Sequence, residues 1–215
     1  MADILPFNPL DKVSLGASVA DALMKSATHP LGSVPEFFGA GIYAIYYAGK
    51  FRAYGELVKL NSGSKFTAPI YVGKAIPSGA RKGGGLGTGP LSRSLYLRLR
   101  EHATSISAVS NLELRDFHCR FLVVDDIWIP LGESQIIARC SPIWNTLIDG
   151  FGNHDPGKGR HSGMRPRWDV LHPGRSWADK CVARKETAAE IEKDVITFLR
   201  AFSFPPSATI VDLDV

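Results

Sequence analysis

Glu133 is the residue whose type and position most directly suggest chemistry. In the stretch LGESQIIARC it precedes Ile136, Ile137 and Cys140 by three, four and seven residues, which places a carboxylate at the start of an apolar helical stripe. Buried carboxylates are rare unless they are paired, capped or bound to a metal. The position is therefore typical of a metal ligand or a catalytic group. A simpler interpretation stays open, because a glutamate in the first turn of a helix also interacts favourably with the helix dipole.

Arg98 and His102 form a second candidate pair, because residues four apart share one face of a helix. A helix is predicted over 92–107, with an apolar stripe that begins at Leu95 and ends at Ile106. The pair lies beside this stripe rather than within it. That placement is equally typical of an exposed surface pair.

Three tyrosines in GIYAIYYA raise the same choice between structure and chemistry. Tyrosine is common in strands, where the ring packs and the hydroxyl finds a partner. Strand alternation predicts that Tyr43 and Tyr47 lie on one face of a sheet and Tyr46 on the other.

Two basic, glycine-rich segments favour a polyanionic partner. From Lys74 to Arg100 there are six Lys or Arg and no Asp or Glu, and GKGRHSGMRPRW at 157–168 adds four more. Guanidinium groups and glycine-rich backbone approach phosphates closely. The net charge of +4 alone would fit an ordinary solvated surface. The residues expected to contact DNA are Arg81, Lys82, Arg93, Lys158, Arg160, Arg165 and Arg167.

The elements that must position these residues alternate between helix and strand. Helical periodicity predicts helices at 14–25, 92–107 and 131–140, and Thr187 with Glu190 forms a capping box for another. β-branched and aromatic runs predict strands in GIYAIYYA, in PIYVGK at 69–74 and in HCRFLVV at 118–124. His29-Pro30 is expected to close the first helix, and PIWN to be extended chain.

The whole chain is typical of one compact domain. At 215 residues it is long enough for one sizeable core. The start lacks the basic and apolar stretches of a signal peptide, and no run of eighteen apolar residues suggests a membrane span, so we expect a cytoplasmic protein. Three widely spaced cysteines favour neither a disulfide framework nor a zinc cluster, and are expected to be core thiols.

Five short motifs, in a fixed order, resemble those of the GIY-YIG nuclease superfamily. They are GIY at 41–43, YVG at 71–73, Arg98 with His102, Glu133, and Asn145 in PIWN. Further blocks are similar to one branch of that superfamily, the type II restriction endonucleases that cut at CCGCGG; they are FNPLDK, SVADAL, GARKGG, GNHDPGKGR and WDVLHPGR. The chain departs from the family pattern in the valine of YVG and in the long glycine-rich insert before Arg98.

The resemblance implies an α+β fold with a small central, mostly antiparallel, three-stranded sheet flanked by helices. It implies a single domain over 1–215. The expected parts are an N-terminal arm at 1–40, a catalytic core at 41–146 with a basic insert at 74–93, and a DNA-contacting extension at 147–215.

The resemblance also implies the hydrolysis of phosphodiester bonds in double-stranded DNA with one divalent metal, magnesium or manganese. Glu133 would hold the metal, and Arg98 would clamp the phosphate. Tyr43 and Tyr71 would be catalytic. A tyrosine needs help to act as a base near neutral pH, and either Lys74 or His102 would give it. Asn145 would orient the phosphate or a water on the metal.

A palindromic target implies two subunits, so a homodimer is expected on DNA. Three other functions are weighed against this one. They are a structure-selective, repair or homing nuclease of the same superfamily, a DNA-binding protein that has lost cleavage, and another small metal nuclease using His154 and His161. Nucleotide binding is disfavoured, because GGGLGTG matches neither common phosphate-binding glycine motif.

Overall fold

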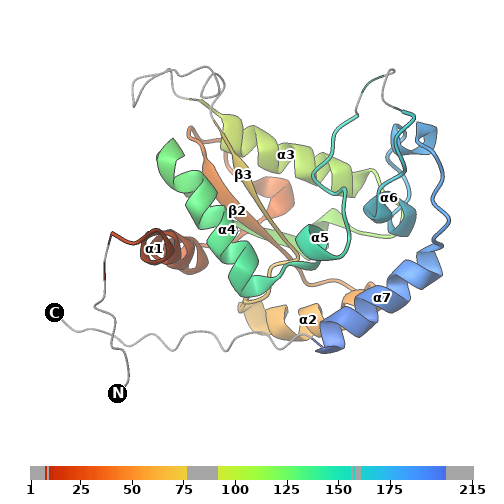
Figure 1. Ribbon diagram of the computed structural model, residues 1–215, viewed down its shortest axis with the longest axis horizontal. Helices are drawn as coiled ribbons and strands as arrows, with labels where there is room; N and C mark the ends of the chain where they lie inside the picture. Colours follow the sequence, from red (N-terminus) through yellow and green to blue (C-terminus); the bar gives the residue numbers. More distant parts are fainter. Residues whose placement is uncertain (1–7, 9, 77–91, 156, 158–160, 202–215) are drawn as a thin grey trace.

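A four-stranded antiparallel sheet forms the centre of the molecule (Figure 1). The computed structural model describes residues 8, 10–76, 92–155, 157 and 161–201. Its strands are β1 (His29–Pro30), β2 (Gly41–Tyr47), β3 (Tyr71–Ala75) and β4 (Phe117–Val123), in the spatial order β1-β4-β2-β3. The α+β fold predicted from the sequence is confirmed.

The sheet has four strands where three were predicted. His29 and Pro30, expected to close the first helix, instead pair with Cys119 and His118 at the edge of β4. A strand of two residues has no alternation that a sequence pattern can reveal. Proline is also tolerated there, because an edge strand leaves one side of its backbone unpaired.

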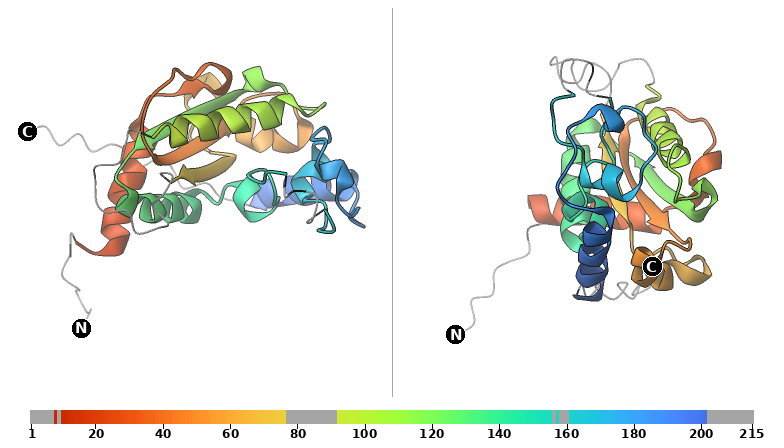
Figure 2. Two further views of the ribbon diagram at one scale, coloured as in Figure 1. Left: turned by 90° about the horizontal axis from the view of Figure 1, so that it is seen from above. Right: turned by 90° about the vertical axis from the view of Figure 1, so that its right-hand side faces the viewer.

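Helices cover both faces of the sheet. Seen from above (Figure 2), α3 lies on one side of the sheet and α4 on the other, with α1 packed against α4. The α-helices of the described chain are α1 (Lys12–Lys25), α2 (Gly55–Asn61), α3 (Ser94–Ser107), α4 (Ile129–Cys140), α5 (Ile143–Thr146), α6 (Arg167–Leu171) and α7 (Ala188–Ala201). No described helix is long and apolar enough to cross a membrane.

Local sequence signals explain where the long helices begin. Asp11 caps α1 by accepting hydrogen bonds from the backbone of Val13 and Ser14. The predicted capping box before α7 is confirmed, since the backbone N–H of Thr187 donates to Glu190 Oε2 and that of Glu190 donates to Thr187 Oγ1. PIWN was predicted to be extended and this is wrong, because it enters the short helix α5 directly after Pro142. Four residues are too few to show helical periodicity.

The strand β2 is buried along its whole length and contributes to two cores. Tyr43 and Tyr47 pack in the core under α3, and Tyr46 packs in the core under α4 and α1. The predicted alternation of the tyrosines is therefore confirmed. The three cysteines are free and buried, as expected.

A directional hydrogen-bond network lies in the core under α6. Trp144 Nε1 donates to Tyr54 Oη at 2.8 Å, and Tyr54 Oη lies 2.6 Å from His172 Nε2. His172 Nδ1 lies 2.9 Å from Oδ1 of Asn111. The amide nitrogen of Asn111 donates to the carbonyl oxygen of Leu171. A neutral imidazole with its proton on Nδ1 satisfies every one of these contacts. Burial, helped by the charge of Arg175, lowers the pKa of His172 to about 3.

This network predicts a loss of stability in mild acid. The unfolded chain binds a proton on His172 below about pH 6.5, whereas the folded chain binds it only near pH 3. The contribution of His172 to the free energy of unfolding is therefore fully retained above the unfolded pKa and falls as the pH is lowered, by up to about 1.4 kcal/mol per pH unit. Urea unfolding between about pH 7.5 and pH 4.5 measures this slope, and a flat profile would contradict the buried neutral state.

Candidate active site

The candidate site is built around β3, which is an edge strand of the sheet. Successive side chains of a strand point to opposite faces. Tyr71 packs against the core on the α3 side, whereas Lys74 reaches Glu133 of α4 on the other side. Burial raises the pKa of both Tyr43 and Tyr71, and the negative charge of Glu133 adds a smaller effect in the same direction. The edge strand β3 therefore carries candidate groups on both faces of the sheet.

Tyr43 and His102 are joined by a short buried hydrogen bond. Tyr43 Oη lies 2.5 Å from His102 Nε2, and the two residues are only 1% and 2% exposed. Burial raises the pKa of Tyr43 well above its usual value, and burial followed by the charge of Arg98 lowers that of His102 well below its own. The phenol therefore keeps its proton, and its hydroxyl donates a hydrogen bond to Nε2 of a neutral imidazole. His102 was predicted to lie beside the apolar stripe. It is instead buried, because the ring of Phe151 stacks on its imidazole with the ring centres 4.6 Å apart.

Arg98 carries the positive charge of the site. Its Nη2 donates to the carbonyl oxygen of Gly152 at 2.7 Å, and its Nη1 donates to Glu101 at 3.0 Å and to the imidazole of His154. Its charge and a hydrogen bond from it lower the pKa of Tyr43, against the larger effect of burial. The guanidinium is thus half-buried beside the phenol, where it can bind an anion.

Gly73 makes room for the Tyr43 ring. The two residues are cross-strand partners, and a Cβ on Gly73 would lie 2.4 Å from Tyr43 Oη and 2.6 Å from Cζ. Real Cβ atoms do not approach that closely, and the buried ring has no space to withdraw. The third residue of YVG is therefore glycine for a steric reason rather than a conformational one.

Gly73→Ala is expected to lower the free energy of unfolding by about 1–3 kcal/mol, because it overpacks a filled core. Urea unfolding measures the change. Gly55→Ala is the matched control, since a Cβ at that helical position meets nothing within 4 Å. The control is expected to be neutral or stabilising by up to about 1 kcal/mol. Equal stabilities for the two variants would contradict the close approach.

Glu133 pairs with Lys74, whose Nζ lies 2.5 Å from Glu133 Oε2. The helix α4 begins at Ile129 and has no acidic residue in its first turn, so Glu133 does not interact with the helix start. Its side chain is 18% exposed and can reach a cation from the solvent side. No group of three or more His, Cys, Asp or Glu suited to a metal occurs within the described ranges. A single carboxylate fits magnesium, which keeps several waters and needs few protein ligands.

Asn145 holds the backbone of β3. Its Oδ1 accepts from the N–H of Val72 and its Nδ2 donates to the carbonyl oxygen of the same residue, both at 2.8 Å. These contacts satisfy backbone groups of an edge strand that no further strand would pair. They also fix the strand between Tyr71 and Gly73. The amide is thus placed to position β3, whereas the sequence had suggested contact with a phosphate or a water on the metal.

Two of the arginines expected to contact DNA hold the C-terminal extension. Arg165 Nε donates to the carbonyl oxygen of Ala178 at 2.9 Å. Arg167 donates to the carbonyl oxygen of Leu147 at 3.0 Å and to Asp194 at 2.5 Å, and its side chain is 12% exposed. Both guanidinium groups are engaged within the chain.

Arg93 lies at the start of α3 and forms an exposed ion pair with Glu36. Such a pair contributes little to stability and is easily exchanged for a phosphate. The remaining expected DNA contacts lie outside the described residues; they are Arg81, Lys82, Lys158 and Arg160.

His154 and His161 take different partners and do not form a joint metal site. His154 contacts Arg98, whereas His161 lies 2.8 Å from Asp155. The contact of His154 with Arg98 was not predicted from the sequence. Its place in the GNHDPGKGR block was the one available signal, because the histidine lies in irregular chain with no periodicity.

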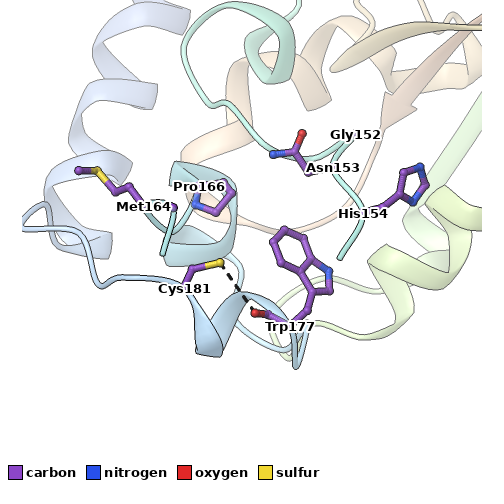
Figure 3. Close-up of a pocket in the computed structure, with 8 residues that line it drawn as sticks. Gly152, Asn153, His154, Met164, Pro166, Trp177 and Cys181 are labelled. Carbon is purple, nitrogen blue, oxygen red and sulfur yellow. Dashed lines mark hydrogen bonds between the residues drawn. The ribbon is translucent and has the colours of Figure 1, made fainter. Parts of the chain in front are cut away.

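A cavity of about 420 Å³ opens beside His154. Figure 3 shows Asn153 and His154 on one wall and the indole of Trp177 on another. The lining residues are Gly152, Asn153, His154, Gly163, Met164, Pro166, Trp177 and Cys181. Part of the segment that contacts Arg98 thus lines this cavity.

Comparison with known proteins assigns the greater part of the chain to one family model. The model described as the Eco29kI GIY-YIG domain matches residues 35–199, which include every catalytic and metal-binding candidate named above. No curated protein sequence matches the chain.

Proposed function

The chain belongs to the Eco29kI GIY-YIG domain family, a family of restriction endonucleases, and from this premise we propose that it is a type II restriction endonuclease. Its substrate would be double-stranded DNA with the site CCGCGG, and it would act in the cytoplasm. The observation that carries the proposal is the buried Tyr43–His102 hydrogen bond, which lies beside Arg98 and next to the edge strand β3.

Tyr43 and His102 would activate the attacking water as a relay. Tyr43 Oη takes a proton from the water while its own proton passes to His102 Nε2, 2.5 Å away. The water oxygen then forms the new bond to phosphorus as the bond to the leaving oxygen breaks. Lys74 is paired with Glu133, so His102 is the better placed of the two groups suggested to assist Tyr43.

Arg98 would bind the phosphate and link substrate binding to proton transfer. Its positive charge contributes to the lowered pKa of His102. A phosphate anion on the guanidinium offsets that charge, so His102 becomes a stronger proton acceptor once substrate is in place. Charge-assisted hydrogen bonds from the guanidinium also stabilise the charge that develops on the phosphate oxygens.

Glu133 would hold the divalent cation, magnesium or manganese, which when bound supplies positive charge to the phosphate and the leaving oxygen. Lys74 would keep the Glu133 carboxylate oriented through their ion pair. Tyr71 lies between Tyr43 and the aromatic ring of Phe151 and would help to position the relay. Asn145 would act indirectly, by fixing the backbone of β3.

The DNA contacts would come from the basic segments. We assign direct contacts to Arg81, Lys82, Arg93, Lys158 and Arg160. Arg165 and Arg167 would instead shape the extension through their internal hydrogen bonds. Their replacement would then weaken DNA binding together with stability, and not binding alone.

Cleavage of a plasmid of known sequence, followed by mapping of the ends, tests the proposed function. The expected result is metal-dependent double-strand cleavage confined to CCGCGG sites. Cleavage at branched or damaged DNA without a fixed sequence would favour a structure-selective or repair nuclease. Specific binding without cleavage would favour a DNA-binding protein on the same scaffold.

One active site per chain cuts one strand, so we propose a homodimer on DNA. A scattering mass measured on a duplex carrying CCGCGG is expected to correspond to two chains per duplex. A mass of one chain per duplex would contradict this assembly.

A further inference from the structure

Arg175, in the WDVLHPGR block, uses all five guanidinium donors inside the protein. It is 5% exposed, and three of its hydrogen bonds end on backbone carbonyl oxygens of one irregular segment, 150–153. They run to Gly150 at 2.9 Å, to Phe151 at 3.0 Å and to Asn153 at 3.2 Å. An irregular segment has no ladder of its own, so Arg175 fixes its path.

Arg175 is itself held on several sides. Asp169 of α6 accepts two hydrogen bonds from it, at 2.7 and 2.6 Å, in a bidentate pair that is almost fully buried. Its guanidinium also lies 4.4 Å from the ring centre of Trp168 and 4.7 Å from that of Trp177. A group held in this way has one orientation and can act as a rigid support.

The segment that Arg175 fixes is the one that contacts the active site. The carbonyl oxygen of Gly152 accepts from Arg98 at 2.7 Å, and the next but one residue, His154, accepts from Arg98 as well. Gly152 also lies against Tyr71, since a Cβ there would approach Tyr71 Oη to 2.6 Å. A shift of the segment is therefore expected to displace both Arg98 and Tyr71.

We propose that Arg175 is a positioning residue for the reaction, acting through segment 150–154 on the Arg98 guanidinium. Its own hydrogen bonds run to Asp169 and to segment 150–153, so its effect on Arg98 is transmitted by the carbonyl of Gly152 and the imidazole of His154. The catalytic part of this inference rests on the proposed function. The structural part, that Arg175 orders Arg98, does not.

Arg175→Lys tests the proposal, because lysine keeps the charge but supplies only three donors without the planar fork. Single-turnover cleavage of a CCGCGG duplex is expected to slow on the order of 100-fold, while the Kd for DNA changes by less than about threefold. Nitrogen NMR of labelled arginine gives a second readout that needs no cleavage. The guanidinium signal of Arg98 is identified by its absence from the spectrum of Arg98→Ala. In Arg175→Lys this signal is expected to broaden or to average.

Asn61→Ala is the matched control. Asn61 is buried and also makes three hydrogen bonds to backbone, to Tyr47 and twice to Ala68, far from segment 150–154 in the chain. It is expected to lower stability and to leave the cleavage constant and the Arg98 signal unchanged at a temperature where the protein is folded. If Arg175→Lys does not fold, Trp177→Leu is measured in its place. Trp177 is half-buried and its ring packs against the Arg175 guanidinium, so its loss removes one of the contacts that hold Arg175.

Normal cleavage and an unchanged Arg98 signal in Arg175→Lys would overturn the proposal. Equal slowing in Asn61→Ala would also overturn it, since the effect would then follow from stability alone. If the wild-type protein cleaves no DNA, the proposed function fails, and the Arg98 signal alone decides whether Arg175 orders that residue.

Discussion

Glu133→Gln is expected to reduce single-turnover DNA cleavage by at least about 10³-fold, while DNA binding stays within about threefold of wild type. Glutamine keeps the shape of the side chain but removes the charge that a hard cation requires. Lys74, which now pairs with that carboxylate at 2.5 Å, would be left beside a neutral amide. Cleavage is measured with magnesium in excess, and binding by fluorescence anisotropy without a divalent metal.

Asp21→Asn in α1 provides the control, because its partner lies on the same helix as Glu133. Asp21 pairs with Arg139 of α4 at 2.5 Å, so its replacement also removes an ion pair from α4, but away from β3. The control is expected to cleave at the wild-type rate. Near-normal cleavage by Glu133→Gln would contradict a metal site at this carboxylate, and equal losses in both variants would point to the helix rather than to the site.

Local regularities made the strands and the long helices predictable. A strand repeats every two residues, so the positions of Tyr43 and Tyr46 on opposite faces follow from the sequence alone. Capping residues such as Thr187 act on neighbours within four residues, so the start of α7 was also predictable. The two-residue edge strand and the short helix α5 contain too few residues to repeat any pattern.

The boundary of α4 shows how a small shift changes the chemistry inferred. The sequence predicted a start at 131, which would have placed Glu133 in the first turn. Pro130 occupies the first turn instead, and the helix begins at Ile129. Glu133 therefore falls in the second turn, where the helix dipole no longer explains a carboxylate and the pair with Lys74 does.

Contacts between distant parts of the chain determined the rest of the site. His102 is buried by Phe151, and Arg98 is held by Gly152, both from irregular chain that follows α5. Arg167 was expected at a DNA surface because it stands in a basic run, yet its partners are Leu147 and Asp194. Charge and spacing in a sequence indicate what a side chain can bind, but the fold decides which partner reaches it.

Tyr43→Phe is expected to lower the single-turnover cleavage constant by about 10²- to 10⁴-fold, the usual range for loss of a general base. The change removes one oxygen and keeps the ring in its buried place. It also leaves His102 Nε2 without the donor that now lies 2.5 Å away, which is expected to cost about 1–3 kcal/mol of stability. Quenched-flow cleavage of a CCGCGG duplex and urea unfolding measure the two effects.

Tyr46→Phe separates the chemistry from the packing. Tyr46 stands on the same strand and is as deeply buried, but it points to the opposite face, where its hydroxyl approaches Met24 Sδ at 3.4 Å. Sulfur is a weak acceptor, so this variant is expected to retain wild-type cleavage and to lose little stability. If Tyr43→Phe cleaves as fast as Tyr46→Phe, the Tyr43 hydroxyl takes no part in activating the water, and the hydrogen bond to His102 only stabilises the core.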